Sequence, residues 1–139
     1  MKRTRPFLDA NVLFSAAWSE ASRLKLLWEV EGADLLASEY VIEEARRNLE
    51  AVEARLRLQG LVQRLRVVPE QLEGLLPAGL ELREKERPVL AAALGARATH
   101  LVTGDRRDFG RFLGQTVAGV LVLTPAEFLA LRRAPSRHR

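Results

Sequence analysis

The chain has 139 residues, of which 47% are hydrophobic, and this length and composition predict one globular domain with a buried core. It contains no cysteine, which excludes disulfides, thiolate zinc sites and a cysteine nucleophile. No apolar run approaches the roughly 18 residues of a membrane span. The N-terminal apolar run ends at Asp9, which makes it too short for a signal peptide. We therefore expect a cytoplasmic protein.

The net charge of +4 comes from the C-terminal end of the chain. Residues 132–139 contain four arginines and no acid, and without these four the remaining 18 basic residues equal the 18 acidic ones. We therefore divide the chain into a single domain over residues 1–131 and a basic tail over residues 132–139. Such a tail either binds nucleic acid electrostatically or is a solvated chain end.

The first part of the chain predicts two strands and two helices. Residues 5–9 are typical of a buried strand, and residues 10–18 of a helix. Residues 21–31 carry apolar side chains three and four positions apart, which predicts a second helix. A short second strand is expected over residues 34–37.

A long helix is expected over residues 39–58, with Ser38 as its N-cap. At about 100° per residue, one arc of its surface collects the apolar side chains Val41, Ile42, Ala45, Leu49, Val52 and Leu56. Glu43 points away from this arc, whereas Glu44 lies on its flank. A flank position reaches a cleft beside the core, so Glu44 is the candidate site residue and Glu43 is expected in solvent.

The second half of the chain continues the alternation. Residues 61–68 are ambiguous between a helix end and a third strand at 64–68, and residues 69–82 carry several prolines and glycines that predict a loop with a broken helix. Further helices are expected at 88–97, 106–113 and from Thr124 onward, and further strands at 99–104 and 119–123. Alternating elements with continuously apolar strands predict an α/β protein whose parallel sheet is covered on both faces.

Acidic residues follow the predicted strands. Asp9 ends the first strand and Asp105 follows the fourth, and the ligand crevice of a parallel sheet lies outside the carboxyl ends of its strands. Each acid also has an ordinary role, because Asp9, Glu86 and Asp105 lie at predicted helix N-termini, which carboxylates cap. Crowded carboxylates repel one another unless a divalent cation joins them, and ligands that offer only oxygen select Mg²⁺ or Mn²⁺.

Other catalytic chemistries lack their motifs. The chain has no nucleophile elbow, no P-loop, no dinucleotide-binding glycine motif and no H-E-x-x-H. His100 lies within a predicted strand, where we expect a core histidine. Hydrolysis by a metal-activated water needs none of these motifs, because carboxylates that leave coordination sites open are sufficient.

Four segments together resemble the PIN-domain family in their order and spacing, from about residue 7 to residue 131: FLDANVL, SEYVIEEARRNL, ERPVLAAAL and HLVTGDRRDFGRF…GVLVLTPAEFL. The resemblance implies a three-layer α/β/α fold with a central parallel five-stranded sheet. It also implies an acidic pocket that binds Mg²⁺ or Mn²⁺ and hydrolyses RNA phosphodiester bonds. Many small members are toxins of the VapC type, which implies a homodimer and a cognate antitoxin.

Carried over by position, the resemblance implies a set of catalytic acids, Asp9, Glu44, Glu86 and Asp105. Of these, Asp9, Glu86 and Asp105 would hold the metal. Asn11 and Thr103 fall where the family has polar residues that orient the acids, and Asp108 is a possible fifth carboxylate. The third acid is usually aspartate, and here it is Glu86, with Glu84 as a nearby competitor. The extra methylene displaces the carboxylate, and Mg²⁺ tolerates little geometric error.

Basic residues flank two of these acids, and arginines beside an acidic pocket suit a polyanionic substrate. The candidates for RNA binding are Arg46, Arg47, Arg106, Arg107 and Arg111. The sequence therefore predicts a Mg²⁺- or Mn²⁺-dependent endoribonuclease, the toxin of a toxin–antitoxin pair.

Two alternatives remain open. One is a catalytically weak PIN-like RNA-binding or scaffold module, suggested by Glu86. The other is a phosphatase with Asp9 as nucleophile, although Asn11 stands where its acid–base aspartate belongs.

Overall fold

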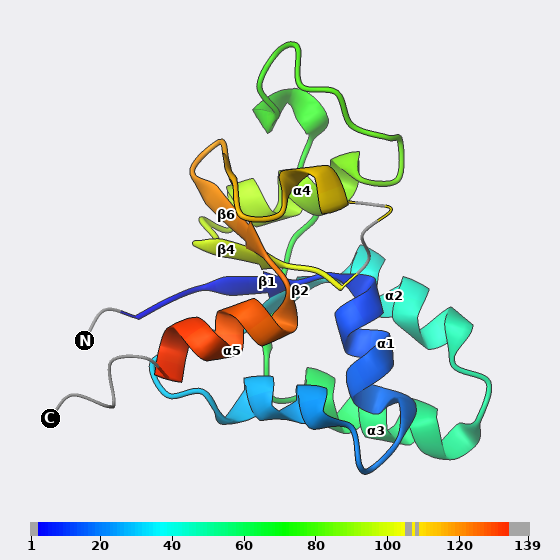
Figure 1. Cartoon of the computed structure of the whole chain (residues 1–139). Coiled ribbons are helices and arrows are strands. Elements are labelled where there is room, and N and C mark those ends of the chain that lie inside the picture. The colour runs from blue at the N-terminus through cyan, green and yellow to red at the C-terminus, as the bar shows by residue number, and fades with distance from the viewer. Residues whose placement is uncertain (1–2, 105–106, 108, 134–139) are drawn as a thin grey trace, which may run out of the picture.

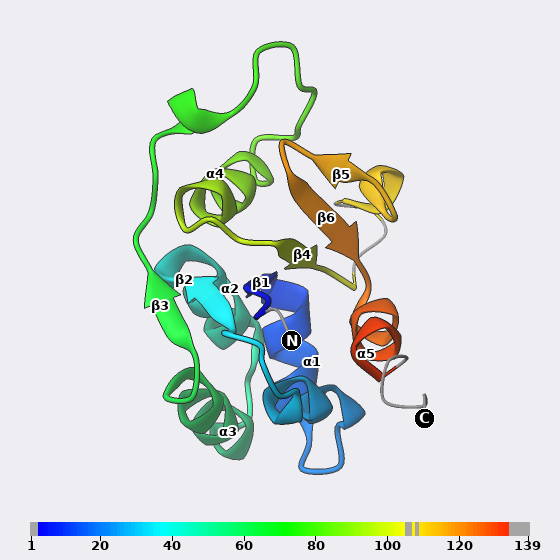
Figure 2. The same ribbon diagram turned by 90° about the vertical axis from the view of Figure 1, so that its left-hand side faces the viewer.

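The computed structural model describes residues 3–104, 107 and 109–133, which form a twisted sheet with helices packed on both of its faces (Figures 1 and 2). The sheet has six strands in the order β3-β2-β1-β4-β6-β5. The strands are β1 (Pro6–Leu8), β2 (Leu36–Ser38), β3 (Arg66–Val68), β4 (His100–Val102), β5 (Thr116–Val117) and β6 (Val120–Leu123).

Five of these strands, from β3 to β6, are parallel, as the sequence predicts. Every residue of β1, β2 and β4 is buried, because both faces of the sheet are covered. The sixth strand, β5, is a correction to the predicted count of five. It pairs antiparallel with β6 across a two-residue turn in which Ala118 and Gly119 have φ values of 52° and 90°, as tight hairpins require.

The described helices are α1 (Ala10–Trp18), α2 (Glu39–Asn48), α3 (Val52–Val62), α4 (Arg87–Gly95) and α5 (Pro125–Arg133), with 3₁₀ turns η1 (Arg23–Glu29), η2 (Glu73–Leu75) and η3 (Gly110–Phe112). Figure 2 shows α4 on one side of the sheet and α1, η1 and α5 on the other, which gives three layers. Three consecutive buried alanines let α4 lie close to the strands. Among the described residues, no helix combines the length and apolar character that crossing a membrane requires.

The long helix predicted over residues 39–58 is wrong, because the chain turns between α2 and α3. Leu49 and Ala51 are extended, and the Leu49 side chain enters the core with no exposed surface. The Arg55 side chain donates a hydrogen bond to the Leu49 carbonyl at 2.6 Å, which satisfies a backbone acceptor at the break. Val52 and Leu56, expected on the buried arc, are instead 68% and 61% exposed.

Two other expectations need correction. The helix predicted over residues 21–31 is the 3₁₀ turn η1, which begins after Ser22. Only η3 is described within the helix predicted over residues 106–113, of which residues 106 and 108 lie outside the described residues. The ambiguous stretch 61–68 contains both alternatives, since α3 ends at Val62 and β3 begins at Arg66.

Candidate functional site

The candidate site lies where the strand order changes direction, between β1 and β4. From β1 the chain builds outward to β2 and β3, and it then returns to place β4 on the other side of β1. Leu8 pairs with Val102, and the Asp9 amide donates a hydrogen bond of 3.0 Å to the Val102 carbonyl. Asp9 and Thr103, which directly follow these strands, therefore lie at the position where open α/β sheets bind ligands.

The described residues include three groups that donate hydrogen bonds to Asp9. It is the N-cap of α1, and its carboxylate accepts from the Ala10 amide at 2.8 Å. The Thr103 hydroxyl donates to it at 3.0 Å, and the Asn11 side-chain amide donates at 3.4 Å. The side chain of Asp9 is nearly buried, with the residue 5% exposed. These donors hold the carboxylate in one orientation.

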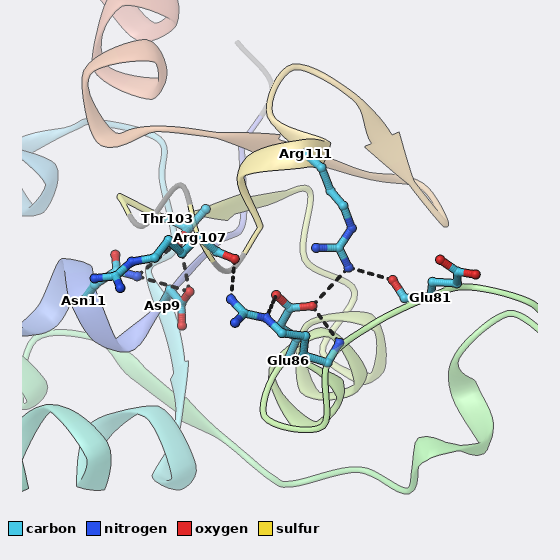
Figure 3. A network of polar contacts seen from close by, with 8 residues as sticks. Asp9, Asn11, Glu81, Glu86, Thr103, Arg107 and Arg111 are labelled. Atoms are coloured by element: carbon cyan, nitrogen blue, oxygen red, sulfur yellow. Dashed lines mark hydrogen bonds and ion pairs between the residues drawn. The ribbon is translucent and has the colours of Figure 1, made fainter.

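Asn11 and Thr103 also hold each other (Figure 3). The Asn11 amide donates to the Thr103 hydroxyl at 3.2 Å, and the Asn11 carbonyl accepts from the Gly104 amide at 2.7 Å. The structure thus places both polar residues beside Asp9, at the positions where the resemblance expects residues that orient the acids. These contacts join the start of α1 to the end of β4 and limit the movement of the carboxylate.

A cavity of about 250 Å³ opens beside Asp9, and we call it the Asp9 cavity. Its walls are Asp9, Ala10, Asn11, Phe14, Glu44, Asn48, Lys85, Glu86, Val89 and Phe109. Three of the four predicted catalytic acids, Asp9, Glu44 and Glu86, therefore lie around one hollow. The fourth, Asp105, lies outside the described residues, as does Asp108.

The two adjacent glutamates of α2 have different surroundings. Glu44 lines the Asp9 cavity with Asn48 one turn further along the helix. Glu43 instead forms an exposed ion pair with Arg46, whose Nε donates to it at 3.0 Å, and this pairing lowers the pKa of the Glu43 carboxyl. The helix therefore presents one glutamate to the cavity and one to solvent.

The pKa of Tyr40 depends on the charges in this region. Burial raises the pKa of the Tyr40 phenol above its ordinary value, and the negative charge of Glu44 raises it further. Lys85 and Arg47 act in the opposite direction. Glu44 and Lys85 are therefore close enough for each to act on the same phenol, and the cavity wall carries charges of both signs.

Glu86 is the most enclosed acid of the cavity, with 1% of its surface exposed. Its carboxylate accepts a hydrogen bond from the Arg83 amide at 2.9 Å and forms ion pairs with the Arg83 and Arg111 guanidinium groups at 3.4 and 3.2 Å. Glu84, the possible competitor, is exposed and is not part of the cavity wall.

The predicted RNA-binding arginines fall into different environments. Arg46 pairs with Glu43, and Arg111 pairs with Glu86. Arg107 is exposed and lines a neighbouring hollow together with Asn11. Arg47 is exposed on α2, and Arg106 lies outside the described residues.

Sequence reasoning missed Lys85 and Arg83. Both lie just before α4, in the charged run that leads to Pro88. This run has no periodicity that would assign a direction to each side chain. Lys85 lines the Asp9 cavity and Arg83 binds Glu86. The only available signal was their nearness in sequence to Glu86.

The carboxylates of Asp9 and Glu44 are oxygen donors of the kind that suits Mg²⁺ or Mn²⁺. Within residues 3–104, 107 and 109–133, however, no group of three acidic or histidine side chains is close enough to hold a metal ion. A complete carboxylate site therefore needs a further ligand, and the chain places Asp105 two residues after Thr103.

The fold and the site together describe an α/β protein with a buried carboxylate at its topological switch point. No protein-family model matches the chain, and no curated protein matches it. A chain in the crystal structure of VapBC2 from Rickettsia felis bound to a DNA fragment from their promoter has the same fold, with a TM-score of 0.63. The two chains are 15% identical, and the match covers 87% of this chain and 98% of that one. This likeness shows the fold.

Proposed function

We propose that this protein is a metal-dependent endoribonuclease, the toxin of a toxin–antitoxin pair. The observation that carries the proposal is the Asp9 cavity, in which a nearly buried carboxylate at the switch point of the sheet shares the cavity wall with Glu44 and Lys85. The fold likeness to a chain of VapBC2 supports the same conclusion as the sequence resemblance.

In this proposal Mg²⁺ or Mn²⁺ is bound by Asp9 and by Asp105, and when bound it supplies a Lewis acid and an activated water for phosphodiester hydrolysis. Asn11 and Thr103 keep the Asp9 carboxylate in its binding orientation. Glu44 lines the same cavity, where its carboxylate would act as the proton acceptor for hydrolysis. Lys85 contributes a positive charge for a substrate phosphate, and Arg47 and Arg107 extend that charge outside the cavity.

The partners and location of the protein belong to the same proposal. An RNA substrate enters the cavity from its open side, a cognate antitoxin controls the activity, and the toxin works as a homodimer in the cytoplasm.

The deciding experiment is RNA cleavage by the wild-type protein and by Asp9→Asn, with and without EDTA. Asparagine caps a helix about as well as aspartate, so Asp9→Asn keeps α1 but loses the charge. We expect cleavage to fall by at least about 100-fold, because even residues that only support a metal ligand are worth 10- to 100-fold. Glu43→Gln, one residue from Glu44 but in solvent, is the matched control and should cleave normally. Cleavage that survives both EDTA and Asp9→Asn would rule out this function.

A catalytically weak RNA-binding module is the second candidate, and it is favoured by the engagement of Glu86 with two arginines. It predicts that RNA binds in a gel-shift assay without being cut, whether Mg²⁺ or Mn²⁺ is added. The phosphatase alternative gains no support, since Asn11 is engaged with Thr103 and Gly104 and has no carboxyl group for acid–base chemistry.

A further inference from the structure

Glu86 lines the same cavity as Asp9, and both oxygens of its carboxylate contact guanidinium groups. One Glu86 oxygen accepts from the Arg83 amide and from Arg111 Nη2, at 2.9 and 3.2 Å, and the other lies 3.4 Å from Arg83 Nε. The two arginines reach this buried carboxylate from the surface, because their side chains are about half exposed.

The charges argue against a metal ion on this carboxylate. The negative charge of Glu86 lies between two guanidinium groups, and each of its oxygens already contacts one of them. A divalent cation at Glu86 would have to displace at least one guanidinium or lie beside both. Displacement would leave a charge without its buried partner, and removing one partner from a buried ion pair is strongly destabilising.

The two arginines also donate hydrogen bonds to backbone carbonyl groups. Arg83 donates a hydrogen bond from its guanidinium to the Arg107 carbonyl, and Arg111 donates to the Glu81 carbonyl at 2.6 Å. Arg111 additionally lies over the ring of Phe112, 4.5 Å from its centre. Figure 3 shows that these contacts cross between the segment before α4 and the segment after β4.

We infer that Glu86 is a positioning residue rather than a metal ligand: its carboxylate, through Arg83 and Arg111, fastens Arg107 and η3, which follow β4, to the N-terminus of α4. In the sequence, Arg107 comes two positions after Asp105, the expected metal ligand. The inference rests on the proposed function only where it concerns metal. It also assigns Arg111 to this clamp instead of to RNA.

A double-mutant cycle tests the clamp without any metal or RNA. Glu86→Gln, Arg111→Met and the double variant are unfolded in urea. Each single variant should destabilise the protein, and the double variant should be more stable than the sum of the two by about tenfold in the unfolding equilibrium constant. The exposed pair Glu43→Gln and Arg46→Met is the matched control, and its coupling should be about twofold or less.

Hydrogen exchange then shows where the clamp acts. The amide of Gly114, which is bonded to the Val122 carbonyl, and that of Leu113, bonded to Gly110, should exchange faster in both Glu86→Gln and Arg111→Met. Amides of α1 should keep their wild-type rates. Uniform acceleration across the chain, or a coupling no larger than that of the control pair, would overturn the inference.

Mn²⁺ binding, followed by electron paramagnetic resonance of the free ion, separates the clamp from a metal ligand. We expect Glu86→Gln to bind Mn²⁺ within about threefold of the wild-type Kd, and Asp9→Asn to bind at least about tenfold more weakly. Tenfold weakening by Glu86→Gln but not by Arg111→Met would show that Glu86 is a ligand and refute the proposal. If the wild-type protein binds no Mn²⁺, the proposed metal dependence fails, whereas the clamp is still decided by the cycle and the exchange rates.

Discussion

The acids that line the Asp9 cavity are positioned by structure of very different range along the chain. Asp9 directly follows a short buried strand, so its place at the carboxyl end of β1 follows from the sequence alone. The position of Glu44 follows from helical geometry over a few residues, which a break further along cannot disturb. The contacts of Glu86 could not be predicted, because Arg111 is 25 residues away in the sequence and no sequence pattern links the two positions.

Tyr40 gives a direct optical measure of the charge at Glu44. It is the single tyrosine of the chain, so the absorbance of tyrosinate reports this phenol alone. We expect the wild-type phenol to ionise above its ordinary pKa, chiefly because of burial. Glu44→Gln should lower that pKa and Lys85→Met should raise it, whereas Glu43→Gln should leave it unchanged.

The raised pKa of Tyr40 also determines how the free energy of unfolding changes with pH in the alkaline range. The folded protein keeps the Tyr40 proton to a higher pH than the unfolded chain does, since its pKa is raised. Above the ordinary value near 10 the unfolded chain releases this proton first, so this group lowers the free energy of unfolding as pH rises. An equal Tyr40 pKa in wild type and Glu44→Gln would contradict the placement of Glu44 beside the phenol.

Elements were predicted well where burial and periodicity agree. The parallel strands β1, β2 and β4 are short and fully buried, and prolines and glycines mark several of the breaks between elements. The turn between α2 and α3 was missed because Leu49, Glu50 and Ala51 include no proline or glycine. Apolar spacing runs across this turn without interruption. What ends α2 is a tertiary contact, the burial of Leu49, and such a contact overrides local propensity.

Leu49 and Leu56 test the break between the two helices with the same substitution. Leu49→Ala removes a fully buried side chain and should cost about 2–5 kcal/mol of unfolding free energy. Leu56→Ala removes a side chain that is 61% exposed and should cost no more than about 0.5 kcal/mol. Urea denaturation measures both. Equal, large losses would instead support the continuous helix, in which both leucines face the core.

At the scale of the whole molecule, the site exists only when the sheet is complete. Asp9 and Thr103 are 94 positions apart, and Asn11 and Gly104 are 93 apart, yet each pair is joined by a hydrogen bond. The parallel order β1-β4 creates this proximity, which is why a prediction of fold class also brings Asp9 beside Thr103. The unfolded chain has no comparable arrangement of carboxylates.

A cation that binds at the Asp9 cavity must therefore stabilise the folded protein, because the unfolded chain offers no such site. By mass action, Mn²⁺ at 100 times its Kd should add about 2.7 kcal/mol, or several degrees in Tm for a domain of this size. Differential scanning fluorimetry of the wild type with Mn²⁺ and with EDTA measures the shift. Asp9→Asn should lose the shift, because its capping asparagine keeps the fold but lacks the charge that attracts the ion. Glu43→Gln should keep the shift, since its carboxylate faces solvent. A rise in Tm that is the same in Asp9→Asn and in the wild type would place the cation elsewhere on the protein and separate metal binding from the switch point of the sheet.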